Sequence, residues 1–531
     1  MSEPGRTTRR VFLGRAAAAA AIPVAAGVGA TIYAENSGSG QPAAAPRPDR
    51  HKAAVRHPVP ENSLPGDPDW NITQLGAPEA IVGYAGRSSV LAGESVPLFV
   101  STSAPSFRVL AFRMGWYNAD LARLVWQSAN VRGGQQRAPA VTPGTNTVAT
   151  DWGPSLTVPT DGWPAGAYLL RLDAETGPQR FVPLTIRSPS TAGRLIIKNS
   201  VSTWQAYNLW GGYDLYNGPA GLADYDNRSL VVSLDRPYDL MGAYLFLAHE
   251  RNLIQLAERI GVPLAYETSM DLAADPGLLT GASALITGGH DEYWTPGERA
   301  SLTAARDAGM NVAFLGANTM FRRIRLENSP LGANRQVICY KTSYTEDPLY
   351  GKDNALVTND YREPPDPDPE SSVTGVLYES NPTDAAYVVT NPDAWMFAGT
   401  GVRAGTQFPG LVGIEYDRVN PVDPVPRPIE IVAHSPLTCR GINSYSDSAY
   451  YTTSSGAGVF ATGTMRWVRS FTGNIGFGIT MDAAYFTRRV TANVLRAFAD
   501  GPAAEKYPAT DNLDAMHEWA GDPIAAEHNL W

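Results

Sequence analysis

The feature that most constrains the fold is a series of short, continuous apolar runs that alternate with helix-like segments after Arg187. The clearest of these runs are residues 195–197, 264–266, 284–286 and 312–315. Continuous apolar runs are typical of strands in a parallel sheet that helices cover on both faces. The sequence therefore predicts an α/β domain over residues 191–500.

Three segments have the spacing and end signals of helices. Residues 243–260 place their leucines largely on one side, and Gly261 stands where a helix C-cap is expected. Thr295 with Glu298 predicts a capping box at the start of a helix over residues 296–308. A last helix over residues 483–498 is expected to close the domain.

Residues 76–190 follow a different pattern, in which apolar and polar residues alternate in short runs separated by Gly, Pro, Asn and Asp. Such alternation at this spacing favours an all-β domain, and we expect an Ig-like β-sandwich. No cluster of titratable groups stands out in it. We therefore interpret this domain as a structural or surface-recognition module.

The two ends of the chain differ in composition from these domains. Residues 1–34 resemble a twin-arginine export signal, with Arg9 and Arg10 ahead of an alanine-rich run that is too mildly apolar for a permanent span. Residues 35–75 are expected to be a flexible linker, with folding starting near Ala77, and residues 501–531 a polar tail. We thus expect an exported protein, secreted or held at the cell envelope, that touches a membrane only if the signal stays uncleaved.

Charge and cysteine content exclude several classes of function. A formal net charge of -10 argues against nucleic acid as a partner, because phosphate binding needs a basic surface. With only Cys339 and Cys439, a disulfide scaffold and a multi-cysteine metal site are excluded. The two thiols either bridge a long loop or lie separately buried.

Between residues 336 and 481 we expect long loops and short β-like runs that form a lid over the sheet.

The segment from Gly289 to Trp294 gathers a histidine, two carboxylates and two aromatics directly after an apolar run. Ligands of open α/β sheets bind beyond the carboxyl ends of the strands, so we expect a site here. The aromatic stretch 203–216 also follows a predicted strand, and it is either a pocket wall or a set of packed surface aromatics. Residues 234–238 place another tyrosine at a turn that a proline fixes. The alternative interpretation of this segment is an ordinary Asp-Arg surface pair.

Four side chains become candidates for one cleft, namely Tyr207, Tyr238, His290 and Glu292. Tyrosine and glutamate are hard oxygen donors, and a phenolate is stabilised by a strongly Lewis-acidic ion, so this set favours ferric iron over zinc or copper. The sequence contains no Gly-x-Ser-x-Gly elbow, phosphate-binding loop or His-Glu-x-x-His helix. Metal-activated water or carboxylate and histidine acid/base chemistry remain.

Several motifs in a fixed order resemble the large (β) subunit of N,N-dimethylformamidase over roughly residues 194–499. These motifs are Thr203-Trp204-Gln205-Ala206-Tyr207-Asn208, Asp235-Arg236-Pro237-Tyr238, Gly289-His290-Asp291-Glu292-Tyr293-Trp294, Phe314-Leu315-Gly316-Ala317-Asn318 and Gly413-Ile414-Glu415-Tyr416-Asp417. The resemblance implies a glutamine-amidotransferase-like, flavodoxin-like α/β domain with loop and β insertions. It also implies a mononuclear iron, held by two tyrosines and one glutamate, and hydrolysis of a small linear amide to a carboxylate and an amine.

Carried onto this chain, the resemblance implies Tyr207, Tyr238 and Glu292 as metal ligands. Tyr213 and Tyr244 compete with Tyr238 for the second tyrosine position. His290 and Asn318 would lie beside the substrate, and Glu415 would transfer the proton. An oligomer or a small partner subunit is a possible partner. The competing hypothesis is a non-catalytic envelope protein that binds carbohydrate or peptide on the same scaffold.

Overall fold

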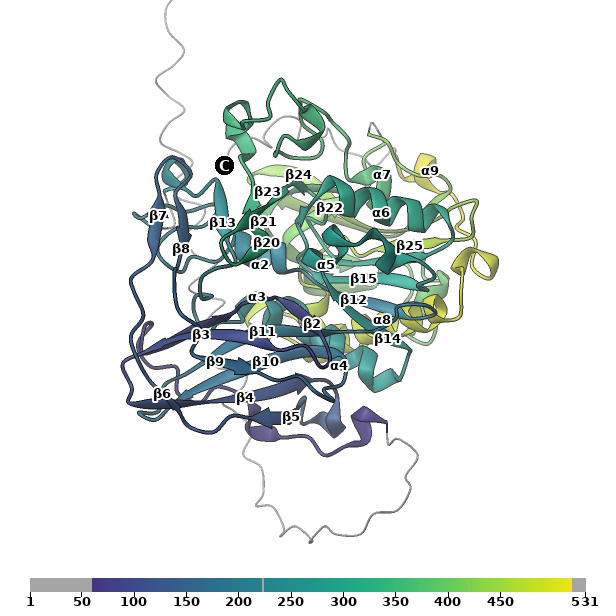
Figure 1. Cartoon of the computed structure of the whole chain (residues 1–531). Helices are drawn as coiled ribbons and strands as arrows, with labels where there is room; N and C mark the ends of the chain where they lie inside the picture. Colours follow the sequence, from purple (N-terminus) through teal and green to yellow (C-terminus); the bar gives the residue numbers. More distant parts are fainter. Residues whose placement is uncertain (1–59, 222–223, 422, 518–531) are drawn as a thin grey trace, which may run out of the picture.

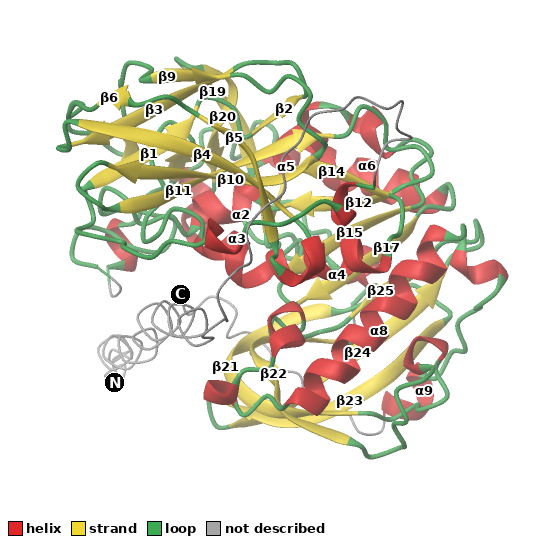
Figure 2. Ribbon diagram, turned by 90° about the horizontal axis from the view of Figure 1, so that it is seen from below, coloured by secondary structure: helices red, strands yellow, loops and turns green. Residues whose placement is uncertain are grey.

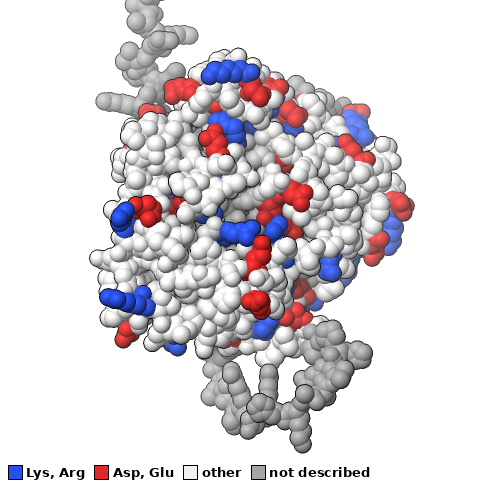
Figure 3. Space-filling view, viewed as in Figure 1, with Lys and Arg blue, Asp and Glu red and all other residues white. Residues whose placement is uncertain are grey.

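A computed structural model describes residues 60–221, 224–421 and 423–517 of the 531-residue chain. The chain is a mixed α/β protein with more sheet than helix (Figure 1). The expected export signal, most of the expected linker and the last part of the expected tail lie outside the described residues. On the face that Figure 3 shows, basic and acidic side chains are interspersed among uncharged ones.

The N-terminal part consists of strands in two main sheets, which lie in the lower part of Figure 1. One sheet has the order β1-β3-β9 and the other β2-β11-β10-β4-β5, with β6 paired to β4. Side chains from both sheets share one hydrophobic core, as alternating strands with one apolar face require. The strands are β1 (Ile81–Ala85), β2 (Ser89–Leu91), β3 (Val96–Thr102), β4 (Ser106–Met114), β5 (Ala122–Gln127), β6 (Val131–Arg132), β9 (Leu156–Val158), β10 (Gly166–Ala174) and β11 (Gln179–Arg187).

Packed structure begins earlier than the expected start near Ala77. Two short 3-10 helices, η2 (Glu61–Ser63) and η3 (Pro68–Trp70), precede β1, and Trp70 is buried against the N-terminal sheet. The Trp70 ring stacks on Phe181 at a centroid distance of 6.2 Å. The boundary of the flexible linker was therefore placed too late, because one tryptophan in a polar segment provides an apolar anchor that average composition hides.

The C-terminal part is built on a seven-stranded sheet with the order β14-β12-β15-β17-β25-β24-β23. The predicted apolar runs form its parallel strands, which confirms the parallel sheet. The strands are β12 (Leu195–Asn199), β14 (Leu264–Thr268), β15 (Ala284–Gly289), β17 (Asn311–Gly316), β23 (Ile429–Cys439), β24 (Ile442–Thr452) and β25 (Gly458–Ala461).

Helices cover both faces of this sheet. Alternate residues of β12 point to opposite sides: Leu195 and Ile197 share a core with α3, α4 and α8, whereas Ile196 shares a second core with α5 and α6. Figure 2 shows α8 running across the sheet. The helices are α2 (Val201–Ala206), α3 (Tyr244–His249), α4 (Arg251–Ile260), α5 (Ser269–Ala274), α6 (Pro296–Asp307), α7 (Ser371–Thr374), α8 (Met481–Ala499) and α9 (Leu513–His517).

Two helix predictions need correction in detail. The single helix expected over 243–260 is divided into α3 and α4 at Glu250, although Gly261 does end it in the left-handed conformation, with φ 73°. At α6 the Thr295 hydroxyl accepts a hydrogen bond from the Glu298 N–H, but the side chain of Glu298 does not complete the box. It forms an ion pair with Lys198 instead, because a buried cation needs a counter-charge more than a backbone N–H needs a second partner.

The region 336–481 contains much more regular structure than expected. β21 (Leu377–Val388) and β22 (Gln407–Arg418) form a long hairpin, and β23 with β24 extends the central sheet in antiparallel fashion. The expectation of only short β-like runs in this region was therefore wrong. Alternating polar and apolar residues with frequent Ser, Thr and Pro concealed these long strands. Smaller sheets are formed by β13 (Val231–Ser233) with β20 (Gly332–Ile338) and β19 (Arg325–Ser329), by β16 (Tyr293–Trp294) with β18 (Arg322–Arg323), and by β7 (Ala140–Thr142) with β8 (Thr147–Ala149).

Part of the expected tail is packed: Leu513 is buried against the central sheet, and α9 contacts β23.

Cys339 and Cys439 are both buried and free, which decides between the two alternatives in favour of separate thiols. In the described ranges, no helix has the length and apolarity needed to cross a membrane.

Candidate active site

The candidate site lies where the order of the central sheet reverses. From β12 the chain passes to β14 on one side, and then returns past β12 to β15 on the other side. Loops that leave β12 and β15 at their carboxyl ends therefore diverge and leave room between them, which is where open α/β sheets bind ligands. Tyr207 follows β12 through the short helix α2, and His290 and Glu292 follow β15 directly.

Glu292 is the centre of the site and is 1% exposed. One carboxylate oxygen, Oε2, accepts a hydrogen bond of 2.6 Å from the Tyr207 hydroxyl. The other, Oε1, accepts one of 2.8 Å from the Tyr216 hydroxyl. The two hydroxyl oxygens lie 3.0 Å apart. Two phenols and one carboxylate thus direct their oxygens at one point, which is the type of donor set that the sequence predicted.

Tyr216 holds the position that was expected for Tyr238. An Asx turn fixes it, since the Asp214 carboxylate accepts hydrogen bonds of 2.7 Å from the backbone N–H groups of Tyr216 and Asn217. The Tyr293 hydroxyl supports it further by donating to the Tyr216 hydroxyl at 2.7 Å. Sequence reasoning included Tyr216 only as part of an aromatic stretch. The signal that marked it was an aspartate two residues before a tyrosine.

The other tyrosines considered lie elsewhere. Tyr238 packs edge-on against Trp204 at a centroid distance of 6.5 Å, and its hydroxyl interacts with the Gln205 side chain. Tyr213 packs in a small aromatic cluster of the N-terminal part, and Tyr244 interacts with Arg469. In the part of the chain that the structure describes, none of the three has a hydrogen bond to Glu292. The expected ligand set is therefore brought together only for Tyr207 and Glu292.

The three predicted catalytic residues form a connected group beside Glu292. His290 Nε2 lies 3.0 Å from the Tyr207 hydroxyl, and His290 Nδ1 lies 3.8 Å from Glu415 Oε2. Asn318 donates a hydrogen bond of 2.9 Å to Glu415. Asn318 has a φ of 55°, and its backbone N–H donates to Asp417 at 2.7 Å. Glu415 thus comes from β22, which forms a separate hairpin with β21, and it reaches the group that follows β15 and β17.

Burial and mutual charge set the protonation of these groups. Burial opposes a charged His290, but the carboxylates of Glu415 and Glu292 outweigh it and raise its pKa to about 9. Burial, and then the charge of Glu292, hold the pKa values of Tyr207 and Tyr216 well above 10. Burial also raises the pKa of Glu415, whereas His290 and Arg322 keep the pKa of Glu292 low despite its burial. Two carboxylates with divergent pKa values beside one histidine are typical of acid/base chemistry.

The family model described as N,N-dimethylformamidase beta subunit-like, C-terminal, matches residues 108–477. The match covers well over half of the chain. The chain belongs to this family. No curated protein matches the sequence.

The dimethylformamidase-like match begins further toward the N-terminus than the resemblance drawn from motifs. That resemblance started near residue 194, whereas the family model begins at residue 108, inside β4 of the N-terminal part. It includes the whole candidate site, from Tyr207 to Glu415. The family is named for a subunit of a hydrolase, which agrees with an amidohydrolase-like function.

Two buried cations next to the dimethylformamidase-like site were not foreseen. The Arg322 guanidinium donates to Glu292 Oε1 at 3.1 Å and also pairs with Asp360. The Lys341 ammonium lies 3.0 Å from the centre of the Tyr216 ring, and burial lowers its pKa well below the usual value. Arg322 belongs to the two-residue strand β18 and Lys341 follows β20, both outside the central sheet, so no sequence spacing linked them to Glu292. They hold the carboxylate and one phenol in place.

A third cation lies beneath the Gly289–Trp294 motif. Lys198, at the end of β12, is fully buried and pairs with Asp291 at 3.0 Å and with Glu298 at 2.6 Å. Its ammonium also lies 3.2 Å from the centre of the Trp294 ring. The motif therefore divides its residues between two roles. Asp291 and Trp294 fasten the loop to β12, while His290 and Glu292 face the site.

Proposed function

We propose that this protein is an exported, metal-dependent amidohydrolase that hydrolyses a small linear amide to a carboxylate and an amine. The observation that carries the proposal is the convergence of the Tyr207 and Tyr216 hydroxyls on the carboxylate of Glu292. Membership of the N,N-dimethylformamidase beta subunit-like family supports amide hydrolysis as the reaction.

The donor set fits a hard, trivalent ion. Tyr207, Tyr216 and Glu292 would hold ferric iron, with Tyr216 in the place first given to Tyr238. Bound there, the ion would supply Lewis acidity for the amide carbonyl and for a water molecule. Proton loss from the two phenols would balance its charge, and Arg322 would continue to orient Glu292 through the hydrogen bond of 3.1 Å.

The remaining residues would carry the protons of the reaction. Hydrolysis adds water across the C–N bond, so one proton leaves the water and one joins the departing amine nitrogen. Glu415 is suited to both transfers because burial raises its pKa and Asn318 fixes one of its oxygens at 2.9 Å. His290 lies between Glu415 and the Tyr207 hydroxyl and would steady the negative charge that develops on the substrate oxygen.

The experiment that tests the proposal compares two tyrosine variants of the full chain. Tyr216→Phe is expected to lose most of the bound iron, the visible tyrosinate absorption band and amine release from a panel of small amides. Tyr238→Phe is the matched control and is expected to retain all three. Iron-free, colourless protein from iron-rich cells, with no amine release, would refute the proposal. Carbohydrate or peptide binding that survives Glu292→Ala would instead support the non-catalytic alternative.

We also propose export by the twin-arginine route and two fold assignments. The N-terminal sheets are inferred to be an Ig-like sandwich, and the C-terminal part an amidotransferase-like domain. Replacement of Arg9 and Arg10 together by lysine is expected to retain the protein in the cytoplasm, whereas the unchanged chain is found in the exported fraction. Equal distribution of both would contradict the export proposal.

A further inference from the structure

The hairpin of β21 and β22 carries further polar side chains beside Glu415 that the proposed reaction leaves unused. Glu415 Oε2 lies 3.8 Å from His290 Nδ1 and accepts a hydrogen bond of 2.9 Å from Asn318. The other oxygen, Oε1, accepts a hydrogen bond of 3.3 Å from the side-chain amide of Asn381. The same amide nitrogen donates to the Tyr378 hydroxyl oxygen at 2.9 Å. Asn381 thus joins Tyr378 to Glu415.

Irregular pairing of the hairpin explains why both side chains reach the site. The register between β21 and β22 shifts between Tyr378 and Ser380, and again between Ser380 and Thr383. Such irregularities bend a strand and re-aim its side chains, and they are common next to active sites. A regular strand would point Tyr378 and Asn381 to opposite faces, because they are three residues apart. The irregular strand instead brings them within one hydrogen bond of each other.

Arg440, at the turn between β23 and β24, fixes the orientation of the Asn381 amide. Its guanidinium Nε donates to the Asn381 backbone carbonyl at 2.6 Å, and its Nη2 donates to the side-chain oxygen Oδ1 at 3.4 Å. Because a guanidinium has only donors, the amide oxygen must face Arg440, and the amide nitrogen then points toward Glu415. Asn381 is therefore held as a donor to the carboxylate and to the phenol.

The Tyr378 hydroxyl has a hydrogen still to donate. Within the described ranges, its oxygen accepts the bond from Asn381 but donates to no other residue. The ring is 6% exposed and packs edge-on against Phe321 at a centroid distance of 5.0 Å. Burial, and then the charges of Glu415 and Glu292, raise the pKa of Tyr378 well above 10, so the phenol keeps its proton. A rigid, protonated donor beside the proposed acid/base group is suited to an oxygen acceptor on the substrate.

We propose that Tyr378 is a further catalytic residue, whose hydroxyl donates a hydrogen bond to the carbonyl oxygen of the bound amide. Its role rests on the proposed amidohydrolase function. When water adds to the carbonyl carbon, the π electron pair of the C=O bond moves onto the oxygen, which becomes negatively charged. A donor at this oxygen binds the tetrahedral adduct more strongly than the planar amide and so lowers the barrier. Tyr378 would act there together with His290.

The protons and electrons of the step balance without any transfer from Tyr378. As the adduct collapses, the oxygen returns its electron pair to re-form C=O, and the pair of the C–N bond leaves with the nitrogen. The proton that the water loses passes through Glu415 to that nitrogen, whereas Tyr378 keeps its own. Asn381 is then a positioning residue, because it holds the phenol and the carboxylate in fixed places on the substrate.

The test measures steady-state amine release by variants of the full chain, with iron content and thermal unfolding as further readouts. Tyr378→Phe removes only the hydroxyl and keeps the ring against Phe321. It is expected to lower kcat by about 10²-fold, as the loss of one oxyanion donor does, while KM changes less than about threefold. Asn381→Ala is expected to lower kcat by at least about tenfold. The double variant Tyr378→Phe/Asn381→Ala is expected to lose less than the product of the two single losses, because both act through one hydrogen bond.

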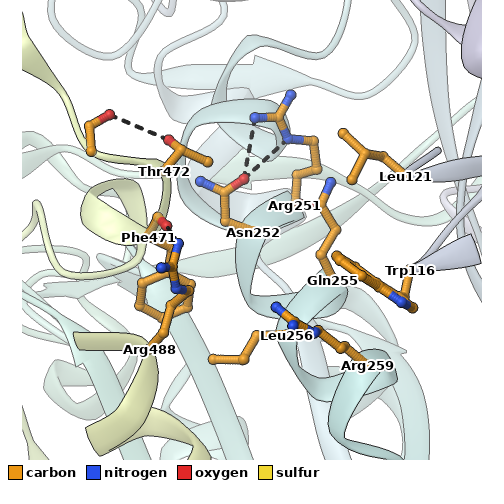
Figure 4. Close-up of a pocket in the computed structure, with 11 residues that line it drawn as sticks. Trp116, Leu121, Arg251, Asn252, Gln255, Leu256, Arg259, Phe471, Thr472 and Arg488 are labelled. Carbon is orange, nitrogen blue, oxygen red and sulfur yellow. Dashed lines mark hydrogen bonds between the residues drawn. The ribbon is translucent and has the colours of Figure 1, made fainter. Parts of the chain in front are cut away.

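Two matched controls come from outside this group. Tyr387→Phe changes another tyrosine of β21, which is 1% exposed and packs against Trp467. Gln255→Leu removes a buried amide on α4, in the cavity of about 340 Å³ that Figure 4 shows between α4, α8 and the N-terminal part. The lining of that cavity includes no residue of the group around Glu415. Both variants are expected to keep kcat and KM.

The outcomes separate the role of Tyr378 from the proposed function. If the unchanged protein releases amine and Tyr378→Phe is as active as Tyr387→Phe, the role of Tyr378 is overturned and the proposed function stands. A raised KM with an unchanged kcat also overturns it, since the hydroxyl would then bind the amide and its adduct equally. Loss of iron or of several degrees of unfolding temperature in Tyr378→Phe would assign a structural role instead. If the unchanged, iron-loaded protein releases no amine, both proposals fail.

Discussion

The Tyr207 hydroxyl and the Glu292 carboxylate, 85 residues apart in sequence, lie 2.6 Å apart in the structure. The first follows β12 and the second follows β15, which are neighbours in the sheet although β14 comes between them in the chain. Any change that shifts β12 relative to β15 would therefore separate the two oxygens. This sensitivity connects the packing of the sheet to the chemistry proposed for the site.

Glu415→Gln is expected to lower kcat for amide hydrolysis by about 10²- to 10⁴-fold, which is the usual contribution of one acid/base group. KM is expected to change little, because glutamine keeps the hydrogen bond from Asn318. Steady-state amine release measures both constants. Asn318→Ala, which removes one of the two amide hydrogen bonds that the carboxylate accepts, is expected to give a smaller loss. A Glu415→Gln protein with an unchanged rate would exclude Glu415 from proton transfer.

Lys198→Met is expected to destabilise the protein by about 3 to 5 kcal/mol, because it leaves Asp291 and Glu298 buried without their cation. Urea unfolding followed by tryptophan fluorescence measures the loss. Lys198→Met/Glu298→Gln, which removes one of the orphaned charges, is expected to recover part of it. If the single variant were as stable as the unchanged protein, Lys198 would not be what fastens the loop to β12.

Glu267 is expected to make stability fall as pH rises. It is fully buried, its two carboxylate oxygens have no hydrogen-bond partner among the described residues, and burial, then Asp271, raises its pKa from 4.5 to about 8. Between these two values the folded state keeps a proton that the unfolded state has lost, so the stabilising contribution is present below pH 4.5 and disappears by pH 8.

The measurement compares the free energy of unfolding at pH 5 and pH 8. Glu267→Gln is expected to lose less stability over this interval than the unchanged protein, by at least about 1 kcal/mol. Asp353→Asn, at an exposed position, serves as the control and is expected to follow the unchanged protein. Identical pH dependence in all three proteins would show that Glu267 ionises normally.

The two cysteines are expected to behave as free, protected thiols. Cys339 and Cys439 are 0% and 1% exposed, so a thiol reagent should react slowly with the native protein. In denaturant, two thiols per chain should react without any added reductant. Detection of thiols only after reduction would establish a disulfide and contradict the structure.

Part of this fold and site could be predicted from local sequence signals. The parallel strands could be predicted because a strand that is buried on both faces is largely apolar, as residues 284–286 are. His290 and Glu292 could be predicted as candidate site residues because ionisable residues that directly follow such a strand indicate a site. In contrast, the strands β21 to β24 mix polar and apolar residues, and their pairing depends on partners that no local pattern identifies. Tyr216 was missed for a similar reason, because its position depends on a turn at Asp214 and on the distant Tyr293.

Both outer strands of the central sheet are covered by other parts of the same chain. Beside β14, the Ser188 N–H donates to the Tyr266 carbonyl at 3.3 Å. Beside β23, Asn512 exchanges hydrogen bonds with the backbone of Ile429 and Ile431. An uncovered edge strand can recruit a strand from another molecule and start aggregation. The N-terminal part and the segment after residue 500 thus cover the two edge strands of the seven-stranded sheet and prevent them from pairing with a strand of another molecule.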